Sequence, residues 1–286
     1  MPSPIDPLMH SVPLTDEEYE QFALFIYQHS GIHLGDNKKE LVKARLMKRI
    51  RHLHCRSFSE YYHYMQTDTT GQEFVEFMNA MSTNVTSFFR EKEHFDFLAH
   101  KALPEICQRK EIQRDKKIRV WSAACSTGEE VYTLLMTLLE HIADPRRWDI
   151  KVLGTDISTR VLAFAETGVY GNDKIGAVPP SIRERYFNCV RQGAGASWQV
   201  KETVKQYATF ARLNLMMENF PFKNVFDIIF CRNVMIYFDK KTQETLVKKF
   251  YRFLAAQGFL FIGHSESLVG VDLDFMRVHN AAFRKT

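Results

Sequence analysis

Small and polar residues follow short apolar runs in the second half of the chain, and two of these positions could bind a nucleotide-like ligand. One run leads into Ser122–Glu130, a turn of small residues that contains Gly128. Another run ends in Asp156. If both runs are strands of one parallel sheet, their carboxyl ends meet at the edge where ligands bind in open α/β sheets. The turn would let a ligand approach the backbone, and the Asp156 carboxylate could accept hydrogen bonds from ribose hydroxyls.

The turn has one glycine where a dinucleotide-binding fingerprint has three. It therefore offers less room for a pyrophosphate, which favours a nucleoside cofactor without phosphates, and S-adenosylmethionine is the candidate. The sulfonium and ammonium groups of that molecule would favour nearby carboxylates, which Glu129 and Glu130 supply. For these residues alone a structural interpretation is equally open, with Gly128 as a turn and Asp156 as the cap of the next helix.

Two further runs end in polar residues that would point into the same crevice. Asn214 ends one run, and the pair Arg232 and Asn233 follows the other, with Tyr237 about one helical turn later. Polar groups at such strand ends are often functional, which favours a role for this pair. The alternative is that Arg232 is solvated in a loop and that Tyr237 packs in the core.

The segment Ser82–Glu91 (STNVTSFFRE) adds a third group of polar side chains. Asn84, Thr86 and Arg90 surround a pair of phenylalanines. The Arg90 guanidinium could bind the α-carboxylate of a cofactor with two hydrogen bonds. Taken alone, the segment is explained at least as well by a helix cap followed by two interfacial phenylalanines.

Positive charge is concentrated between Lys38 and Arg56. This stretch holds eight Lys or Arg residues against one acid, Glu40, which leaves a local net charge of +7. On a helix its apolar residues form one stripe and most of the basic residues lie on an adjoining arc. Three interpretations are open: a solvated face, an acidic protein partner, or nucleic-acid phosphates. The stretch has no aromatic residue that could stack on bases, which favours an acidic protein over single-stranded nucleic acid.

The elements that position these residues change type along the chain. From Leu14 to about Phe77 the apolar spacing predicts helices, the first of them capped by Thr15 or Asp16. Beyond Arg119, apolar runs alternate with helical stretches, which is typical of a parallel sheet covered by helices. Six runs are expected strands: Ile118–Ala124, Ile150–Asp156, Tyr207–Leu215, Phe226–Cys231, Gly258–His264 and Met276–Phe283.

We therefore expect a helical domain over residues 1–76, a linker over 77–95 that contributes to the cofactor pocket, and a catalytic domain over 96–286. Between the first two strands, Val131, Leu134, Leu135, Leu138 and Ile142 form the apolar stripe of a crossover helix. Residues from about 185 to 206 interrupt the alternation with glycines and short alternating pieces, and we interpret them as a small inserted antiparallel β-subdomain.

Composition sets outer limits on the function. The chain has 286 residues, 45% of them hydrophobic, and a net charge of only +4, so the average composition does not imply nucleic acid. Its five cysteines are scattered and form no metal-ligand spacing, so we expect no metal site and a reduced compartment. No signal peptide or membrane-spanning run is present in the sequence, which predicts a cytoplasmic protein without direct membrane insertion.

Six strings in this order resemble the bacterial chemotaxis receptor methyltransferases (CheR-type): TNVTSFFRE, VWSAACSTGEE, GTDIS, RLNL, FCRNVMIYF and GHSES. These enzymes are S-adenosylmethionine-dependent protein-glutamate O-methyltransferases that act on the signalling helices of chemoreceptors. The resemblance covers nearly the whole chain. It implies a Rossmann-like α/β methyltransferase domain, with a mostly parallel sheet and helices on both faces, beside a small all-helical N-terminal domain and an inserted antiparallel β-subdomain.

The resemblance also implies roles for particular residues. It implies a cofactor pocket for S-adenosylmethionine, with S-adenosylhomocysteine as the product, made by Asn84, Thr86, Arg90, Glu130, Asp156, Asn214, Leu215, Arg232 and Asn233. Tyr237 would lie near the transferred methyl group, and Arg90 and Tyr237 are the expected catalytic residues. Arg45, Lys48, Arg49 and Arg51 would face the acidic methylation region of the receptor. We therefore expect charge reversal at Arg45 and Arg49 to weaken receptor methylation and to leave cofactor affinity intact.

The expected partner is the cytoplasmic helices of a chemoreceptor. Some relatives also dock through the β-subdomain onto a peptide at the receptor's C terminus, but the loop Arg191–Lys201 carries its glycines at a different spacing. A glutamate side chain has an ordinary pKa near 4.3 and is already an ionised nucleophile at pH 7, so no general base is required. We assign no catalytic role to His264.

Two other functions are compatible with the pattern. One is a nucleic-acid methyltransferase with the same cofactor domain, although the chain reads RNVMIYF after the strand and lacks the Pro-Pro-aromatic step that amino-methylating DNA enzymes have. The other is a non-catalytic module that senses the cofactor or holds a receptor. A nicotinamide-dependent dehydrogenase is disfavoured by the poor dinucleotide fingerprint.

Overall fold

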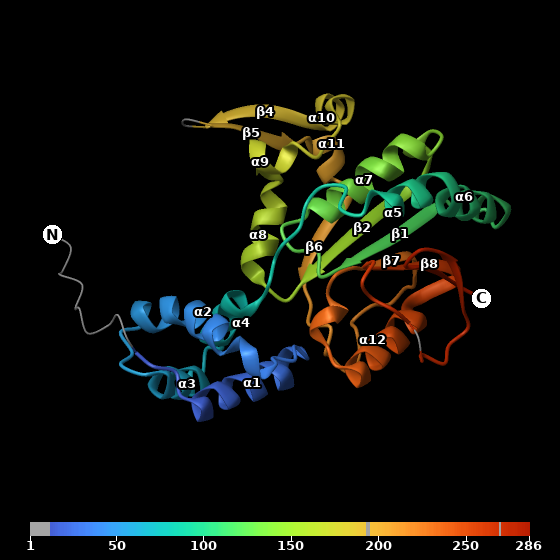
Figure 1. Ribbon diagram of the computed structural model, residues 1–286. Coiled ribbons are helices and arrows are strands. Elements are labelled where there is room, and N and C mark those ends of the chain that lie inside the picture. The colour runs from blue at the N-terminus through green and yellow to red at the C-terminus, as the bar shows by residue number, and fades with distance from the viewer. Residues whose placement is uncertain (1–11, 193–194, 269) are drawn as a thin grey trace. The chain divides into compact units, whose positions relative to one another are not determined.

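The chain is described by a computed structural model that covers residues 12–192, 195–268 and 270–286 (Figure 1). It divides into two compact units. The first unit runs to Thr83 and includes Tyr237–Asp239, and the second comprises Asn84–Ile236 and Lys240–Thr286. The first unit extends past the boundary expected at residue 76, because the helix that contains that residue continues to Met81.

The first unit is helical, as the sequence predicts. Its helices are α1 (Asp16–Ser30), α2 (Lys39–His52), α3 (Phe58–Thr67) and α4 (Gln72–Met81). Thr15 caps α1, because its side chain accepts a hydrogen bond from the backbone N–H of Glu18 while Glu18 binds the Thr15 N–H in return. The helices pack around the buried ring of Phe22, which contacts the rings of Tyr61 and Phe77. Those ring contacts join α1, α3 and α4 in one small core.

The second unit is built on a seven-stranded sheet in the order β6-β2-β1-β7-β8-β10-β9. The strands are β1 (Lys117–Ala123), β2 (Asp149–Asp156), β6 (Ala208–Arg212), β7 (Phe226–Cys231), β8 (Leu254–Ile262), β9 (Phe275–His279) and β10 (Ala282–Lys285). The first five strands of that order are parallel. The chain moves from β1 to one side through β2 and to the other side at β7, so the strand order reverses beside β1. Ligands bind at the carboxyl ends of the strands at such a reversal.

The last predicted strand is wrong. Met276–Phe283 is expected as one strand, but the chain forms the hairpin of β9 and β10, which pair antiparallel. Ala281 makes the turn with a φ of +53°. The sequence at the turn has neither glycine nor proline, so the usual sign of a reversal is missing.

Helices cover both faces of the sheet, as expected. Figure 1 shows α7 (Glu129–His141) on one face and α12 (Lys240–Phe253) on the other. The predicted stripe on α7 is buried, and Tyr132 and Met136 are buried as well, so α7 is enclosed on more than one side. Other helices of this unit are α5 (Lys92–Phe97), which continues through the π-helical turn η3 (Leu98–Ala102) into α6 (Leu103–Ile112), and α8 (Thr159–Thr167).

A separate three-stranded antiparallel sheet is inserted in the second unit, which confirms a β-subdomain, although one of its strands, at Val169–Gly171, lies before the predicted bounds of about 185–206. Its order is β3-β5-β4, with β3 at Val169–Gly171, β4 at Phe187–Gln192 and β5 at Gly195–Val200. The short helices α9 (Asn172–Ile175), α10 (Pro180–Tyr186) and α11 (Glu202–Lys205) flank it. Residues 193 and 194 of the predicted loop lie outside the described residues. Within the described parts of the chain, no helix is both long and apolar enough to cross a membrane.

The sheet and α7 meet at Gly154, where there is no room for a side chain. A Cβ at this position would lie 2.7 Å from Cγ2 of Val131 and 2.8 Å from Cδ1 of Phe210. We predict that Gly154→Ala lowers the free energy of unfolding by about 1–3 kcal/mol, because the buried neighbours must shift. Urea denaturation would measure the loss. Gly176→Ala is the control, since its nearest neighbour is 3.7 Å away, and an equal loss in both variants would contradict the prediction.

Candidate functional site

Five loops gather at the carboxyl edge of the parallel strands. They follow β1, β2, β6, β7 and β8, and each carries residues that the sequence singled out or a close neighbour of them. Parallel strands place these loops on the same edge of the sheet. The expectation that the polar strand ends lie together is therefore met for residues of the second unit.

The turn after β1 has an unusual backbone. Ala124, Ser126 and Gly128 have φ values of +63°, +50° and +90°. Gly128 is the N-cap of α7 and lies against α8, where a Cβ would be 2.7 Å from Cβ of Ala165. The glycine is therefore required by helix packing and by its left-handed backbone. The Tyr170 hydroxyl donates to the Thr127 carbonyl at 2.7 Å and holds the turn from the side of β3.

Asp156 joins the turn after β1 to the loop after β2. Its Oδ2 accepts a hydrogen bond from the Ser126 N–H at 2.9 Å, and its Oδ1 accepts one from the Ser158 N–H at 3.0 Å. Ser158, not Asp156, is the cap of α8. Burial raises the pKa of Asp156, and the backbone N–H groups of Ser158 and Ser126 oppose that rise. An ionised carboxylate has about four lone-pair sites, so the group can accept hydroxyl donors in addition to these backbone N–H groups.

Arg232 carries a deeply buried charge among the predicted site residues. Its side chain is only 2% exposed, and it lies 3.3 Å from Oε2 of Glu91 and 3.6 Å from Oε2 of Glu130. Its Nη2 also donates to the Arg90 carbonyl. The Nε atom is buried and has no hydrogen-bond partner among the residues described. Two carboxylates thus balance the buried guanidinium.

Glu130 is held by β1 as well as by Arg232. The Ser122 hydroxyl donates to its Oε1 at 2.7 Å. Burial raises the pKa of Glu130, and Arg232 opposes the rise. The prediction that Glu129 also supplies a carboxylate to a ligand is wrong. Glu129 is fully buried and pairs with Lys174, because it leaves the first turn of α7 in another direction.

Asn233 follows Arg232 with a left-handed φ of +58°. Its Nδ2 donates to Oε1 of Glu91 at 3.2 Å. Glu91 therefore contacts both polar residues that follow β7. Burial acts to raise the pKa of Glu91, but Arg232 and the Asn233 amide outweigh it, so the pKa is lowered.

The segment before Glu91 reaches the same edge. The Ser126 hydroxyl donates to the Asn84 carbonyl at 3.1 Å, and Nη1 of Arg90 donates to the Val85 carbonyl at 2.8 Å. Thr86, which lies between Asn84 and Arg90 in the sequence, is half-buried. The Arg90 guanidinium has further N–H donors for an anionic ligand.

The loop after β6 is fixed by its own side chain. Oδ1 of Asn214 accepts a hydrogen bond from the Met216 N–H at 2.9 Å. The Leu213 N–H donates to the Asp156 carbonyl at 3.0 Å, and Leu215 is buried. Asn214 and Leu215 are thereby connected to the loop that carries Asp156.

The basic helix α2 is only partly available to a partner. Arg45 donates to the Met81 carbonyl and, at 2.8 Å, to the Thr83 hydroxyl. Arg49 pairs with the buried carboxylate of Glu73. Lys48 and Arg51 are exposed and form no ion pair within the described chain; the exposed cations of this stretch are Lys38, Lys48, Arg51 and Arg56.

These contacts correct the expectation for Arg45 and Arg49. Charge reversal at Arg49 would place a second carboxylate beside buried Glu73, and reversal at Arg45 would break two hydrogen bonds that hold the end of α4. Either substitution would disturb the helical unit itself. They therefore cannot separate receptor binding from folding.

Tyr237 belongs to the first unit, whereas Arg90, the other predicted catalytic residue, belongs to the second. Its carbonyl accepts a hydrogen bond from the His33 N–H at 2.8 Å, and Phe238 forms an antiparallel bridge with Ile32. The structure groups Tyr237 with the helical unit. Its place beside a transferred methyl group stays a prediction.

Sequence reasoning gave no role to two carboxylates of this edge. Glu91 ends the string TNVTSFFRE, and Glu266 lies in GHSES. Both strings were recognised, but neither the charge nor the spacing indicates that Glu91 meets Arg232 or that Glu266 accepts backbone hydrogen bonds. These contacts depend on loops from different strands.

Glu91, His94 and His264 have ligand-type atoms within 4.8 Å of one another. The Glu91 carboxylate already lies beside the Arg232 guanidinium, which opposes a second cation there. His94 is fully buried, and Nε2 lies 3.2 Å from the Asn280 carbonyl. Burial and the nearby charge of Arg232 lower the pKa of His94 to about 4.

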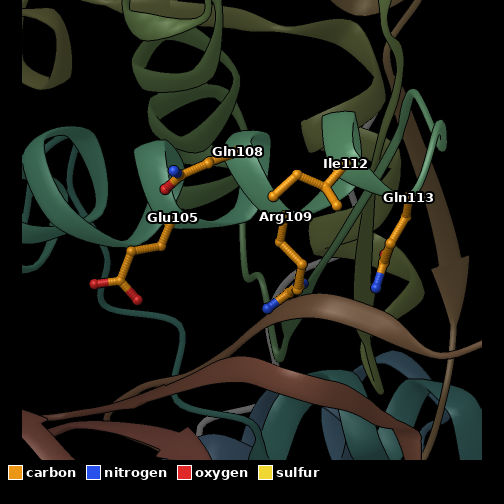
Figure 2. A pocket seen from close by; sticks show the side chains of 5 residues that line it. All are labelled: Glu105, Gln108, Arg109, Ile112 and Gln113. Carbon is orange, nitrogen blue, oxygen red and sulfur yellow. The ribbon is translucent and has the colours of Figure 1, made fainter.

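A hollow on the surface lies at the opposite end of the strands. Figure 2 shows it over α6, lined by Glu105, Gln108, Arg109, Ile112 and Gln113. Nη1 of Arg109 donates to the Gln257 carbonyl at 2.8 Å and Nη2 lies 3.7 Å from Asp227. Asp227 lies near the start of β7, at the amino edge. This hollow is therefore separate from the five loops.

The low pKa of His94 predicts a pH-dependent stability. Between pH 4 and 6.5 the unfolded chain binds a proton at His94 that the folded chain excludes, so stability falls as the pH drops through this range. We predict that His94→Gln removes about 2 kcal/mol of the stability loss between pH 7 and pH 5. Urea titrations at both pH values measure this difference. Exposed His52→Gln is the control, and the same pH dependence in wild type and His94→Gln would contradict the prediction.

Comparison with known proteins identifies the family of this chain. Residues 17–82 match the domain described as "CheR methyltransferase, all-alpha domain", and residues 84–283 match "CheR methyltransferase, SAM binding domain". A chemotaxis protein methyltransferase of Borreliella burgdorferi is 40% identical over 261 residues, which is 91% of each chain. A chemotaxis protein methyltransferase of Escherichia coli K12 is 38% identical over 266 residues, 92% of this chain and 88% of the relative.

The two matched domains meet between residues 82 and 84, where the structure divides its two units. The second match contains all five loops of the carboxyl edge. The chain belongs to the CheR methyltransferase family and is an S-adenosylmethionine-dependent methyltransferase.

Proposed function

We propose that this protein transfers the methyl group of S-adenosylmethionine to glutamate side chains on the cytoplasmic signalling helices of chemoreceptors. The products are glutamyl methyl esters and S-adenosylhomocysteine, and the reaction serves chemotactic adaptation. The observation that carries the proposal is the buried group of Arg232, Glu91 and Glu130 at the same carboxyl edge as Asp156, in a chain whose relatives are named chemotaxis protein methyltransferases. The reaction would take place in the cytoplasm, where those helices lie.

The residues of the carboxyl edge suit the cofactor. Asp156 accepts backbone N–H groups with both oxygens, and a carboxylate has about four lone-pair sites, so it can still accept a ribose hydroxyl. Arg90 has donors for the α-carboxylate, and Glu130 can offset a positive sulfonium or ammonium group. In this proposal Asn84, Thr86, Asn214, Leu215, Arg232 and Asn233 complete the pocket.

When it is bound, S-adenosylmethionine supplies a methyl group on a positively charged sulfur. The substrate glutamate is ionised at neutral pH and attacks without a general base. The chain's own residues must therefore position the two reactants and keep the site from neutralising the nucleophile. In this proposal Arg90 and Tyr237 act at the reacting groups. We propose that the reaction needs no metal ion. The Arg232 guanidinium already balances the charge of Glu91, which is the carboxylate of the group Glu91, His94 and His264.

A receptor helix with acidic methylation sites needs a cationic surface at some distance from the methyl donor. Arg45, Lys48, Arg49 and Arg51 remain the proposed surface. Lys48 and Arg51 meet the partner with exposed side chains, whereas Arg45 and Arg49 mainly hold the helix in place. Long-range attraction between the two surfaces raises the rate of encounter.

The small β-subdomain is the proposed second contact, for a peptide at the receptor's C terminus. Its strand order leaves β4 at one side without a neighbouring strand in the portion of the chain that is described. An extended peptide can add to such an edge through backbone hydrogen bonds.

The reaction is tested by transfer of labelled methyl from S-adenosylmethionine to chemoreceptor cytoplasmic fragments. We predict base-labile label on the receptor, because glutamyl methyl esters hydrolyse in base, and at least about a tenfold loss with Asp156→Asn. Duplex DNA and RNA are parallel substrates. Label on nucleic acid alone would contradict the receptor assignment, and cofactor binding without any transfer would favour a sensing module.

The partner surface is tested by charge reversal at exposed residues. We predict that Lys48→Glu with Arg51→Glu slows receptor methylation by about tenfold at low salt, and by less at high salt, because electrostatic attraction is screened. The affinity for S-adenosylmethionine should not change. The matched control is Lys241→Glu with Lys248→Glu on exposed positions of α12. An equal loss in that control would show that net charge alone is responsible.

A further inference from the structure

Glu266 joins the two loops that follow β7 and β8. Its Oε2 accepts hydrogen bonds from the Gly263 N–H at 2.6 Å and the Asn233 N–H at 3.2 Å. Its Oε1 accepts hydrogen bonds from the Val234 N–H at 2.9 Å and the Ile236 N–H at 3.3 Å. One carboxylate thus binds four backbone donors, three of them in the loop that begins with Arg232 and Asn233.

The two loops are too close for any side chain at Gly263. A Cβ there would lie 2.7 Å from Nδ2 of Asn233, 2.8 Å from its backbone N and 3.0 Å from Oε2 of Glu266. The contact therefore fixes the Asn233 side chain as well as its backbone. The glycine is required by this close approach, since its own φ is not in the left-handed region.

Asn233 needs such support because of its backbone. Its φ of +58° lies in the left-handed region, which is unfavourable for a residue with a side chain, although asparagine tolerates it better than most. In this conformation its Nδ2 reaches Glu91, which also contacts Arg232. The hydrogen bonds to Glu266 hold the backbone in the form that makes those side-chain contacts.

A carboxylate is suited to this role and an amide is not. Ionised Glu266 has only acceptors and can accept all four bonds, whereas glutamine would turn an NH₂ group toward two of the donors. Burial raises the pKa of Glu266, and the four backbone donors oppose the rise. No salt bridge pairs Glu266 with a cationic side chain among the residues described, so its charge is balanced by the dipoles of the four backbone N–H groups.

We propose that Glu266 is a positioning residue for cofactor binding, which acts by holding Asn233 in its left-handed conformation. The inference rests on the proposed role of Asn233 in the cofactor pocket. Glu266 itself need not touch S-adenosylmethionine.

The test is a double-mutant cycle on the affinity for S-adenosylmethionine in the full-length protein. We expect Glu266→Gln and Asn233→Ala each to weaken binding by about tenfold or more. In the Asn233→Ala background, Glu266→Gln should have little further effect, because its action runs through that residue. The KM for receptor fragments should stay unchanged. Glu93→Gln, which removes an exposed carboxylate on α5, is the control and should bind normally.

Each outcome decides between specific possibilities. Additive effects of the two substitutions, or a normal affinity in Glu266→Gln alone, would overturn the positioning role and leave the cofactor site intact. Normal affinity in both single variants would show that the proposed site itself is wrong. If Glu266→Gln does not fold by circular dichroism, Gly263→Ala replaces it in the cycle, since it forces the same loops apart and keeps the carboxylate.

Discussion

A buried guanidinium determines how the loops at the carboxyl edge of the sheet are arranged. Arg232 leaves a completely buried strand, and its side chain is 2% exposed. A charge in that position is stable only with partners, because its desolvation is costly. Glu91 and Glu130 supply opposite charge from two other segments, and the Arg90 carbonyl accepts a hydrogen bond. The segment before α5 is held to the sheet by these contacts.

Carboxylates connect the other loops in the same way. Asp156 binds backbone N–H groups of the turn after β1 and of its own loop, and Glu266 binds the loops after β7 and β8. The loops are thus fixed by groups within the protein, so little reordering is required when a ligand binds. In the proposed function, Asp156 also accepts the ribose hydroxyls and Glu130 offsets the positive sulfonium or ammonium group. In that proposal one set of residues serves both stability and binding.

Local patterns predicted most of the fold. Apolar runs located the parallel strands, and small residues located the turn before α7, because strand burial and turn geometry depend on residues close in sequence. The hairpin at Asn280–Ala281 was missed because its turn has no glycine or proline. The orientation of Glu129, the ion pair of Arg49 with Glu73 and the four hydrogen bonds of Glu266 depend on residues distant in sequence. The expected cofactor residues rest mainly on the family resemblance, because it implies which residues distant in sequence lie together in the pocket.

The most direct measurement is a crystal structure with bound S-adenosylhomocysteine. The arrangement of loops predicts that the ribose hydroxyls lie against Asp156 and that the amino-acid end lies toward Arg90 and Glu130. Arg232 should keep its contacts with Glu91 and Glu130. Density for the molecule away from the carboxyl edge, or a ribose that makes no contact with Asp156, would contradict the assignment of the site.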